Sequence, residues 1–369
     1  MSAQLVECVP NFSEGRDRAV IDAIALSIAG VAGASLLDVD PGADTNRTVY
    51  TYVGSPEAVA EGAIAAAKTA WAYIDMAKHK GVHPRMGALD VCPFVPISGI
   101  GMGECVELAK RVGSGIAMEL GVPVFLYEAA ATRPERKSLA DIRSGEYEGL
   151  RAKLASPEWA PDFGSASFVP RWGATAVGAR EFLIAYNVSL NTRDTRLANE
   201  VAFAIRERGR AAKDAAGRPL KGASGETLRI PGRLKRVRAI GWYIDYYRCA
   251  QVSINILDHK VSPLDLVFET VKEEAGKLGL LVTGSELVGL VPLDAIVAAG
   301  RRFLSQRGKS EDARESELIE TAVRAMGLDS VADFDPARKI LEYAVAGSSK
   351  TGIHLSRLLP PFSQKLFRG

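Results

Sequence analysis

The stretch from Ile74 to Asp90 concentrates the residues of this chain that could do chemistry. Within eight positions it carries two of the four histidines and three cations: Lys78, His79, Lys80, His83 and Arg85. Histidine has an unperturbed pKa close to neutrality, so it can accept and donate protons at working pH. The charges of Lys80 and Arg85 should favour the neutral, basic form of His83. His83 is therefore a candidate general acid and base, and a turn histidine bonded to the backbone is an equally weighted alternative.

His79 receives a structural interpretation. The alanine-rich helix before it is expected to run to about Lys80, so His79 would lie in the last helical turn, where cations complement the helix dipole. Gly81 and Pro84 then end the helix and force a turn.

A second group of polar residues lies where strands are expected to end. Asp40 closes the strand Ser35–Asp40, and we expect only one of Asp38 and Asp40 to face a given side. A carboxylate at that position could bind a cationic group such as an amidine, although a turn or capping aspartate is slightly more common. Three further polar residues on loops or strand edges could converge with it as substrate-binding residues: Asn11, Arg47 and Arg85.

The common motifs of other enzyme classes are missing from the sequence. It contains no G-x-x-x-x-G-K-[ST] phosphate loop, no H-E-x-x-H and no G-x-S-x-G, and Gly99–Gly103 lacks the dinucleotide spacing. The four cysteines form no C-x-x-C pair and show no zinc-like spacing to a histidine. We expect no metal ion and no covalent nucleophile.

Composition is that of a globular protein. The 369 residues are 47% hydrophobic and 24% charged, and the net charge of +2 argues against a nucleic-acid partner. No apolar run approaches the ~18 residues that a bilayer requires, and residues 1–7 do not resemble a signal peptide. The expected location is the cytoplasm, with no membrane partner.

Hydrophobic periodicity predicts two successive β-α-β-β-α-β patterns. The first comprises Leu5–Pro10, Asp17–Gly30, Ser35–Asp40, Arg47–Gly54, a helix capped by Ser55 and Leu89–Ile97, extended by a helix at Gly103–Leu120 and a strand at Val122–Tyr127. The second comprises Glu181–Asn191, Thr192–Glu207, Lys235–Asp245, Ala250–Leu257, Ser262–Gly279 and Leu280–Val288, and helices follow at Pro292–Gln306, Glu311–Met326 and Asp335–Val345.

The fold class is therefore α+β, with two ferredoxin-like subdomains that have mixed sheets and helices on their outer faces. We expect domains at residues 1–180 and 181–327, followed by a C-terminal helix and tail at 328–369 that is loosely held from Gly347. Residues 130–173 are expected to be irregular, and Gly209–Arg233 to be an exposed loop.

Five stretches together resemble glutamate formimidoyltransferase (formiminotransferase) over roughly residues 4–345. They are Val6–Gly15, Asp38–Tyr50, His83–Pro93, Trp159–Gly173 and Ala239–Tyr243. The resemblance implies two ferredoxin-like subdomains, a homodimer, and transfer of a formimino group from N-formimino-L-glutamate to N5 of the co-substrate tetrahydrofolate, a late step of histidine degradation. The animal enzyme also carries a cyclodeaminase domain, for which this chain ends too soon, so we expect a monofunctional transferase.

The resemblance also implies roles for residues. His83 matches the catalytic histidine, and Asp40 matches an acidic residue that assists at the reacting centre. The folate-binding loop is matched by Gly164, Ser165, Ala166, Ser167, Phe168, Val169, Pro170, Arg171, Trp172 and Gly173. Gly209–Arg233 looks longer than the corresponding loop of the family.

These roles suggest a mechanism. Folate would lie between the subdomains with its ring stacked on the Phe168–Trp172 loop. His83 would take the N5 proton and return one to the departing glutamate nitrogen, while Asp40 stabilises the positively charged amidine. A positive funnel could steer the carboxylates of both substrates, including a polyglutamate tail: Arg47, Arg85, Arg171 and Lys78–Lys80.

Two other functions remain open from the sequence. The same site could transfer a formyl group between 5-formyltetrahydrofolate and glutamate. The chain could also be a non-catalytic folate-binding module, since ferredoxin-like folds host many functions.

Overall fold

The computed structural model describes residues 4–308, 313–331 and 333–351. The chain divides into two units, one formed by Met1–Glu181 with Ala344–Gly369 and the other by Phe182–Tyr343. The expected loose tail lies almost wholly in residues 352–369, outside the described part of the chain.

The first unit is built on a seven-stranded sheet. Its strands are β1 (Leu5–Cys8), β2 (Asn11–Phe12), β3 (Ala34–Gly42), β4 (Arg47–Gly54), β5 (Leu89–Ser98), β6 (Val124–Glu128) and β7 (Thr175–Ala179). Strand β4 lies between β3 and the interrupted strand β1–β2, which also pairs with β5; all these pairs are antiparallel. Beyond β5, the strands β7 and β6 are added in parallel.

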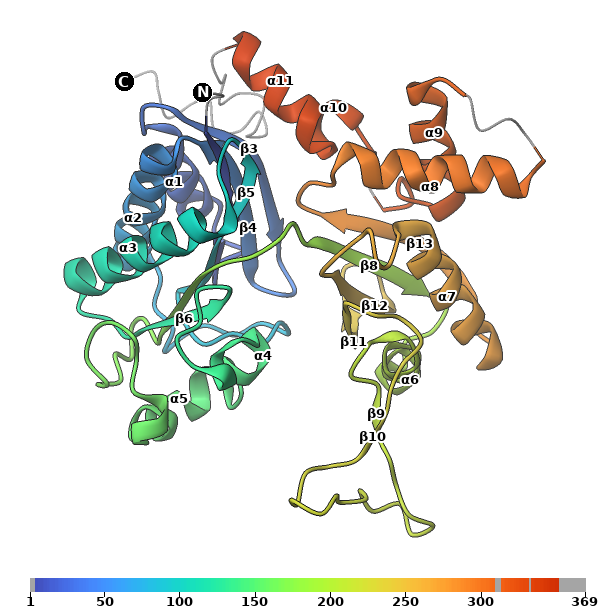
Figure 1. Cartoon of the computed structure of the whole chain (residues 1–369), viewed down its shortest axis with the longest axis horizontal. Helices are drawn as coiled ribbons and strands as arrows, with labels where there is room; N and C mark the ends of the chain where they lie inside the picture. The colour runs from blue at the N-terminus through green and yellow to red at the C-terminus, as the bar shows by residue number, and fades with distance from the viewer. Residues whose placement is uncertain (1–3, 309–312, 332, 352–369) are drawn as a thin grey trace. The chain divides into compact units, whose positions relative to one another are not determined.

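Three helices cover one face of this sheet, as Figure 1 shows: α1 (Arg18–Ala29), α2 (Pro56–Tyr73) and α3 (Met102–Leu120). The side chains of Asp17 and Ser55 cap α1 and α2 by accepting backbone N–H groups, which an isolated helix end leaves unsatisfied. Small buried alanines of α2, such as Ala63 and Ala66, let the helix approach the sheet closely. The large apolar core of the unit lies between these helices and the sheet.

The opposite face of the sheet is covered only in part. Short helices pack over β5, β6 and β7 around a smaller apolar cluster that includes Phe125, Ile142 and Leu150. They are η1 (Pro134–Arg136), α4 (Leu139–Ile142), α5 (Glu146–Leu154) and η2 (Pro157–Trp159). Where β1, β3 and β4 form this face, polar side chains such as Glu7, Asp38 and Thr51 lie on it, and the candidate site begins at this boundary.

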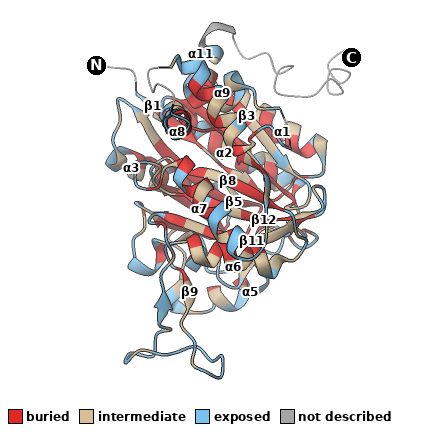
Figure 2. Ribbon diagram, turned by 90° about the vertical axis from the view of Figure 1, so that its right-hand side faces the viewer, coloured by how far each residue is buried: buried red, intermediate tan, exposed pale blue. Residues whose placement is uncertain are grey.

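The second unit contains a four-stranded antiparallel sheet in the order β11, β12, β8, β13. Its elements are β8 (Ile184–Leu190), α6 (Thr195–Ile205), β11 (Val237–Ile244), β12 (Cys249–Ile256), α7 (Leu264–Lys277) and β13 (Val282–Val288). Helices α6 and α7 pack against one face and enclose a second core (Figure 2). The strands β9 (Arg210–Ala211) and β10 (Arg229–Ile230) form a separate short ladder that carries the exposed loop 212–228.

The C-terminal part adds helices to this unit. They are α8 (Leu293–Gln306), α9 (Glu315–Met326) and α10 (Pro336–Lys339). The last helix, α11 (Leu341–Thr351), begins in this unit and belongs from Ala344 on to the first unit. A single helix was expected from Asp335 to Val345, but the chain is extended at Ile340, which forms a bridge with Val291. The buried side chain of Ile340 explains the interruption, because it enters the core of the second unit.

The α+β class is confirmed, and further details of the expected elements are wrong. The second sheet is purely antiparallel, not mixed. Residues 130–173 contain the short helices described above, and β7 follows them without having been predicted. Helix α2 ends at Tyr73 and not at Lys80, because the chain turns to bury Ile74 and Met76 while the guanidinium of Arg171 bonds the carbonyls of Trp71 and Ala72 at 2.9 and 2.7 Å.

A substitution at Gly173 tests how closely the backbone before β7 approaches the loop that carries His83. Its φ is +78°, and a Cβ there would lie 2.0 Å from the carbonyl oxygen of Met86. We expect Gly173→Ala to lower the free energy of unfolding by about 1–2 kcal/mol from the left-handed backbone, plus about 1–3 kcal/mol from the clash. Gly121→Ala is the matched control, since Gly121 has φ +68° with nothing within 4 Å. Equal losses for both variants, measured by chemical denaturation, would contradict the close approach.

Candidate functional site

The centre of the candidate site is the carboxylate of Asp90, which is fully buried. In the pairing of β2 with β5, Asn11 lies opposite Val91 and Phe12 opposite Leu89, so Asp90 is the extra residue of a β-bulge. A bulge re-aims the side chain that it carries. Here it brings the Oδ2 atom of Asp90 within 2.5 Å of guanidinium nitrogens from both Arg47 and Arg143.

Further hydrogen bonds fix this ion cluster. The Oδ1 atom of Asp90 accepts the backbone N–H of Met86 at 2.9 Å, and Arg47 donates from Nε to Oδ1 of Asn11 at 3.1 Å. Burial alone would raise the pKa of Asp90, but the charges of Arg143 and Arg47 outweigh it and lower the pKa to about 2. Burial also lowers the pKa of Arg47 to about 10. Asp90 and Arg47 are therefore both charged near neutral pH.

His83 lies beside this cluster on the loop between α2 and β5. Its side chain is half-buried, and Nδ1 is 2.7 Å from the carbonyl oxygen of Pro84. A carbonyl can only accept, so Nδ1 carries the proton and the lone pair of the neutral ring is on Nε2. Burial, followed by the charges of Arg47 and Arg143, holds the pKa of His83 well below its usual value. His83 is thus a neutral imidazole with a defined tautomer, as a general base requires.

His79 has the opposite tautomer and a different role from the one expected. It is buried, not part of a helical turn; Nε2 donates to the carbonyl of Asn46 at 2.7 Å, and Nδ1 accepts from Nε of Arg85 at 3.3 Å. Asn46 in turn accepts the N–H of Gly15 and donates to the carbonyl of Lys80. The expectation of a cation at a helix end is wrong, and His79 instead ties the His83 loop to the β3–β4 turn.

Arg85 was expected to converge with Asn11 and Arg47, but its guanidinium contacts other residues. Its guanidinium donates to both carboxylate oxygens of Glu148 at 2.7 and 2.8 Å and to Glu146 at 3.2 Å. Together with Lys80, Gly81 and Gly145, these residues line a shallow cavity of about 480 Å³. Arg47 and Asn11 do meet directly.

Asp38 and Asp40 lie on the same face of β3, so the expectation that only one faces a given side is wrong. Residues two apart in a strand share a face, and the two aspartates are paired with Thr51 and Val49 of β4. Leu37 is an extra residue between Leu36 and Asp38 in this pairing. The bulge turns both carboxylates away from the helix-covered core, where regular pairing after Leu36 would have placed them.

The predicted folate loop, Gly164–Gly173, divides into an exposed and a buried part. Residues 164–167 are exposed, and the Oγ of Ser165 bonds the Oγ of Ser167 at 2.9 Å. The ring of Phe168 is half-buried between Tyr147, with ring centroids 5.4 Å apart, and the guanidinium of Arg151 at 4.7 Å. Trp172, by contrast, is fully buried and donates from its indole nitrogen to Thr175 at 2.9 Å, so it supports the loop from within the core.

Arg143 was missed by sequence reasoning, although it shares the central carboxylate. It follows the last residue of α4, inside the stretch expected to be irregular. Asp90 stood out only as a residue flanking the histidines, because an acidic residue in an apolar strand does not reveal a bulge. A usable signal was the isolated Asp90 within the otherwise apolar run Leu89–Ile97, since a buried charge must have a partner.

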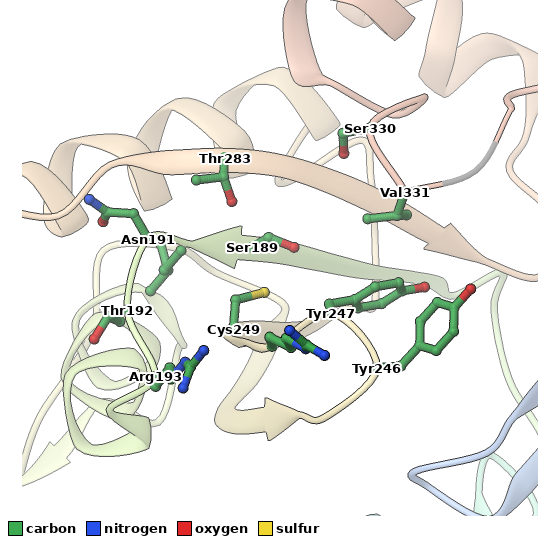
Figure 3. A pocket seen from close by; sticks show the side chains of 12 residues that line it. Ser189, Asn191, Thr192, Arg193, Tyr246, Tyr247, Cys249, Thr283, Ser330 and Val331 are labelled. Atoms are coloured by element: carbon green, nitrogen blue, oxygen red, sulfur yellow. The ribbon is translucent and has the colours of Figure 1, made fainter.

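The second unit contains a separate cavity of about 510 Å³ (Figure 3). Arg193 and Arg248 line it together with hydroxyl-bearing side chains and the half-buried thiol of Cys249. Nearby on the same sheet, Glu286 accepts hydrogen bonds from Asn187, Tyr247 and Gln251 at 3.1, 2.8 and 3.2 Å. None of the sequence-predicted site residues lines this cavity.

Two features that other functions would need are absent from the described residues. Among them, no group of three or more histidine, cysteine, aspartate or glutamate side chains is arranged to hold a metal ion. No helix within those same ranges combines the length and apolar character needed to cross a bilayer.

Comparison with known proteins finds relatives for both units. The model of the "Formiminotransferase domain, N-terminal subdomain" matches residues 5–180, and that of the "Formiminotransferase domain" matches residues 185–346. Formimidoyltransferase-cyclodeaminase of Mus musculus is 52% identical over 94% of this chain, which spans only 61% of the mouse protein. Glutamate formimidoyltransferase of Streptococcus pyogenes serotype M1 is 43% identical, and that of Thermoplasma acidophilum 40%; the matches cover 82% and 83% of this chain and 94% of each relative.

The burial of His79 predicts how the stability of the protein depends on pH. Burial is the main cause that lowers its pKa in the folded protein, whereas the unfolded chain has an ordinary pKa of about 6.5. As the pH falls through about 6.5, the unfolded chain binds the proton first, so the free energy of unfolding falls. We expect His79→Gln, which keeps a donor and an acceptor but cannot titrate, to lose less stability than wild type between about pH 8 and about pH 5.5.

Denaturant midpoints at the two pH values measure this effect. Lys78→Gln is the control, because its side chain is exposed and it keeps His79. An acid-induced loss in His79→Gln as large as that of wild type would show that His79 does not titrate as described.

The central carboxylate makes a separate prediction. Asp90→Asn would leave two guanidiniums around a neutral group, and removing one partner of a buried ion pair typically costs about 3–5 kcal/mol. Glu119→Gln is the control, because its pair with Lys68 is half-exposed on both sides and should contribute at most about 1 kcal/mol. Urea unfolding of both variants measures the difference, and similar losses would refute the central role of Asp90.

Proposed function

The chain belongs to the formiminotransferase family, and from this membership we propose that it is a glutamate formimidoyltransferase. It transfers the formimino group of N-formimino-L-glutamate to N5 of tetrahydrofolate, giving 5-formiminotetrahydrofolate and L-glutamate in histidine degradation. The single observation that carries the proposal is the neutral His83, held in one tautomer beside a positively charged cluster.

The proposed reaction needs one group that moves a proton. The N5 lone pair attacks the formimino carbon, and a tetrahedral centre forms. His83 accepts the N5 proton on Nε2 and returns it to the glutamate nitrogen as the bond between that nitrogen and the carbon breaks. The step balances without another reactant. The carbonyl of Pro84 stabilises the imidazolium intermediate by accepting from Nδ1 throughout.

Asp40 and the loop Gly164–Gly173 complete the proposed site. The carboxylate of Asp40 stabilises the cationic amidine, and its position on the polar face of β3 supports this role. The exposed residues 164–167 contact folate, and Phe168 offers an aromatic ring that Tyr147 and Arg151 hold in place. Trp172 acts by fixing the loop, since its burial argues against a role in stacking on the ligand.

Several broader features are part of the proposal. Both units are variants of the ferredoxin-like fold, which the strand orders β3-β4-β1-β5 and β11-β12-β8-β13 support. The domain boundaries follow residues 1–180, 181–327 and 328–369. The enzyme acts in the cytoplasm as a homodimer, and its folate substrate can carry a polyglutamate tail.

An assay of formimino transfer tests the proposal. Wild type should convert N-formimino-L-glutamate and tetrahydrofolate, and His83→Ala should lose about 10²–10⁴-fold in kcat, the usual contribution of general acid–base catalysis. His259→Ala is the matched control, because His259 lies in the second unit and bonds Asp294.

The outcome separates the competing functions. Near-full turnover by His83→Ala would exclude the histidine role. A wild type that binds folate but is active only with 5-formyltetrahydrofolate and glutamate would favour formyl transfer, and one inactive with either donor would favour a binding module.

A further inference from the structure

The ion cluster at Asp90 carries one more positive charge than negative charge. Arg47 and Arg143 share one carboxylate oxygen of Asp90, and the other oxygen accepts the N–H of Met86. The remaining side-chain bond of Arg47 goes to the neutral Asn11. Within the described part of the chain, neither guanidinium has an ion pair with a second carboxylate.

An excess positive charge is unusual on side chains that are this deeply buried. The side chains of Arg47 and Arg143 are only 6% and 14% exposed, so water screens their charges poorly. A buried charge without a counterion is costly, and proteins normally supply a partner for it. Another buried arginine of the same unit, Arg136, illustrates the normal case, because it pairs with Asp162 at 2.7 Å and donates to backbone carbonyls.

The cluster is also held in a form suited to bind an anion. Asp90 and Asn11 orient Arg47, and the same oxygen of Asp90 orients Arg143, so little side-chain entropy is lost on binding. Guanidiniums bind carboxylates through paired N–H donors. The N–H of Met86, three residues after His83, bonds Asp90 at 2.9 Å, so the loop that carries the proposed base is attached to the cluster. Both guanidinium charges also act on His83.

We propose that Arg47 and Arg143 together bind the α-carboxylate of the glutamate moiety, with Arg143 as a substrate-binding residue and Asp90 as the positioning residue for both. This inference rests on the proposed function. In formiminoglutamate, the α-carboxylate is attached to the carbon that bears the reacting nitrogen. A carboxylate held beside His83 therefore places the departing nitrogen within reach of its acid, whereas the γ-carboxylate lies further along the chain.

Binding without turnover gives the most direct test. Calorimetry measures the affinity of the full-length protein for L-glutamate and for L-isoglutamine, in which the α-carboxylate is an amide. Wild type should bind L-glutamate at least about tenfold more tightly, as expected for hydrogen bonds to a charged group. Arg143→Gln should lose most of this preference, with the affinity for L-isoglutamine and for tetrahydrofolate changed less than about twofold.

Two further variants distinguish a role of Arg143 in substrate binding from a role in stabilising the fold. Arg143→Lys keeps the charge without the planar fork and should recover part of the preference. Arg133→Gln is the control from the same segment, because in the described part of the chain its guanidinium bonds only the carbonyl of Glu158. In the transfer assay, Arg143→Gln should raise KM for N-formimino-L-glutamate at least tenfold and leave KM for tetrahydrofolate within about twofold.

Three outcomes would overturn the inference. They are a wild type that does not distinguish the two ligands, an Arg143→Gln variant that keeps the preference, and a variant that loses affinity for all three ligands equally, as a purely structural arginine would. If Arg143→Gln does not fold, wild type is compared with Arg143→Lys instead. The inference is then refuted if Arg143→Lys keeps both the preference for L-glutamate over L-isoglutamine and the KM for N-formimino-L-glutamate unchanged. Binding of L-glutamate by a wild type that transfers no formimino group would refute the proposed function alone.

Discussion

The candidate site depends on one buried carboxylate, that of Asp90. Its two oxygens connect three segments: Arg47 at the start of β4, Arg143 after α4 and the backbone of Met86 in the loop that carries His83. Because the carboxylate is inaccessible to water, each of these bonds is stronger than it would be at the surface. The same contacts that hold the segments together also leave a net positive charge near His83. The residues that stabilise the packing here therefore also set the electrostatics of the proposed base.

Two β-bulges create this arrangement from an otherwise ordinary sheet. The bulge at Asp90 turns its carboxylate towards Arg47, and the bulge at Leu37 moves Asp38 and Asp40 to the polar face of β3. Without them, alternation along the strands would direct these acids towards the helix-covered apolar core, where a buried charge is costly. The sheet therefore keeps one apolar face for stability and gives part of the other face to polar groups.

Features that depend on residues close together in the sequence could be predicted, whereas features that depend on contacts between distant residues could not. Helix α1 and strand β4 were predicted closely, because the helical spacing of the apolar residues between Val20 and Ile28 and the β-branched run from Arg47 are local signals. The end of α2 was missed because its last carbonyls are bonded by Arg171, about a hundred residues away in the chain. The bulges and the partnership of Arg143 with Asp90 depend on register and distant contacts, which periodicity does not contain.

The two histidines of the central loop show why residue type alone could not assign roles. His79 and His83 are four residues apart, and each has a backbone carbonyl as a hydrogen-bond partner, but the carbonyl of Asn46 meets Nε2 of one and that of Pro84 meets Nδ1 of the other. In His79, the remaining nitrogen accepts from Arg85, which commits the ring to the fold. In His83, the lone pair is on Nε2, and burial, followed by the charges of Arg47 and Arg143, lowers the pKa and disfavours protonation. If a substrate carboxylate binds Arg47 and Arg143 as proposed, its negative charge would offset the part of the lowering of the His83 pKa that these two charges cause, while the part caused by burial would stay.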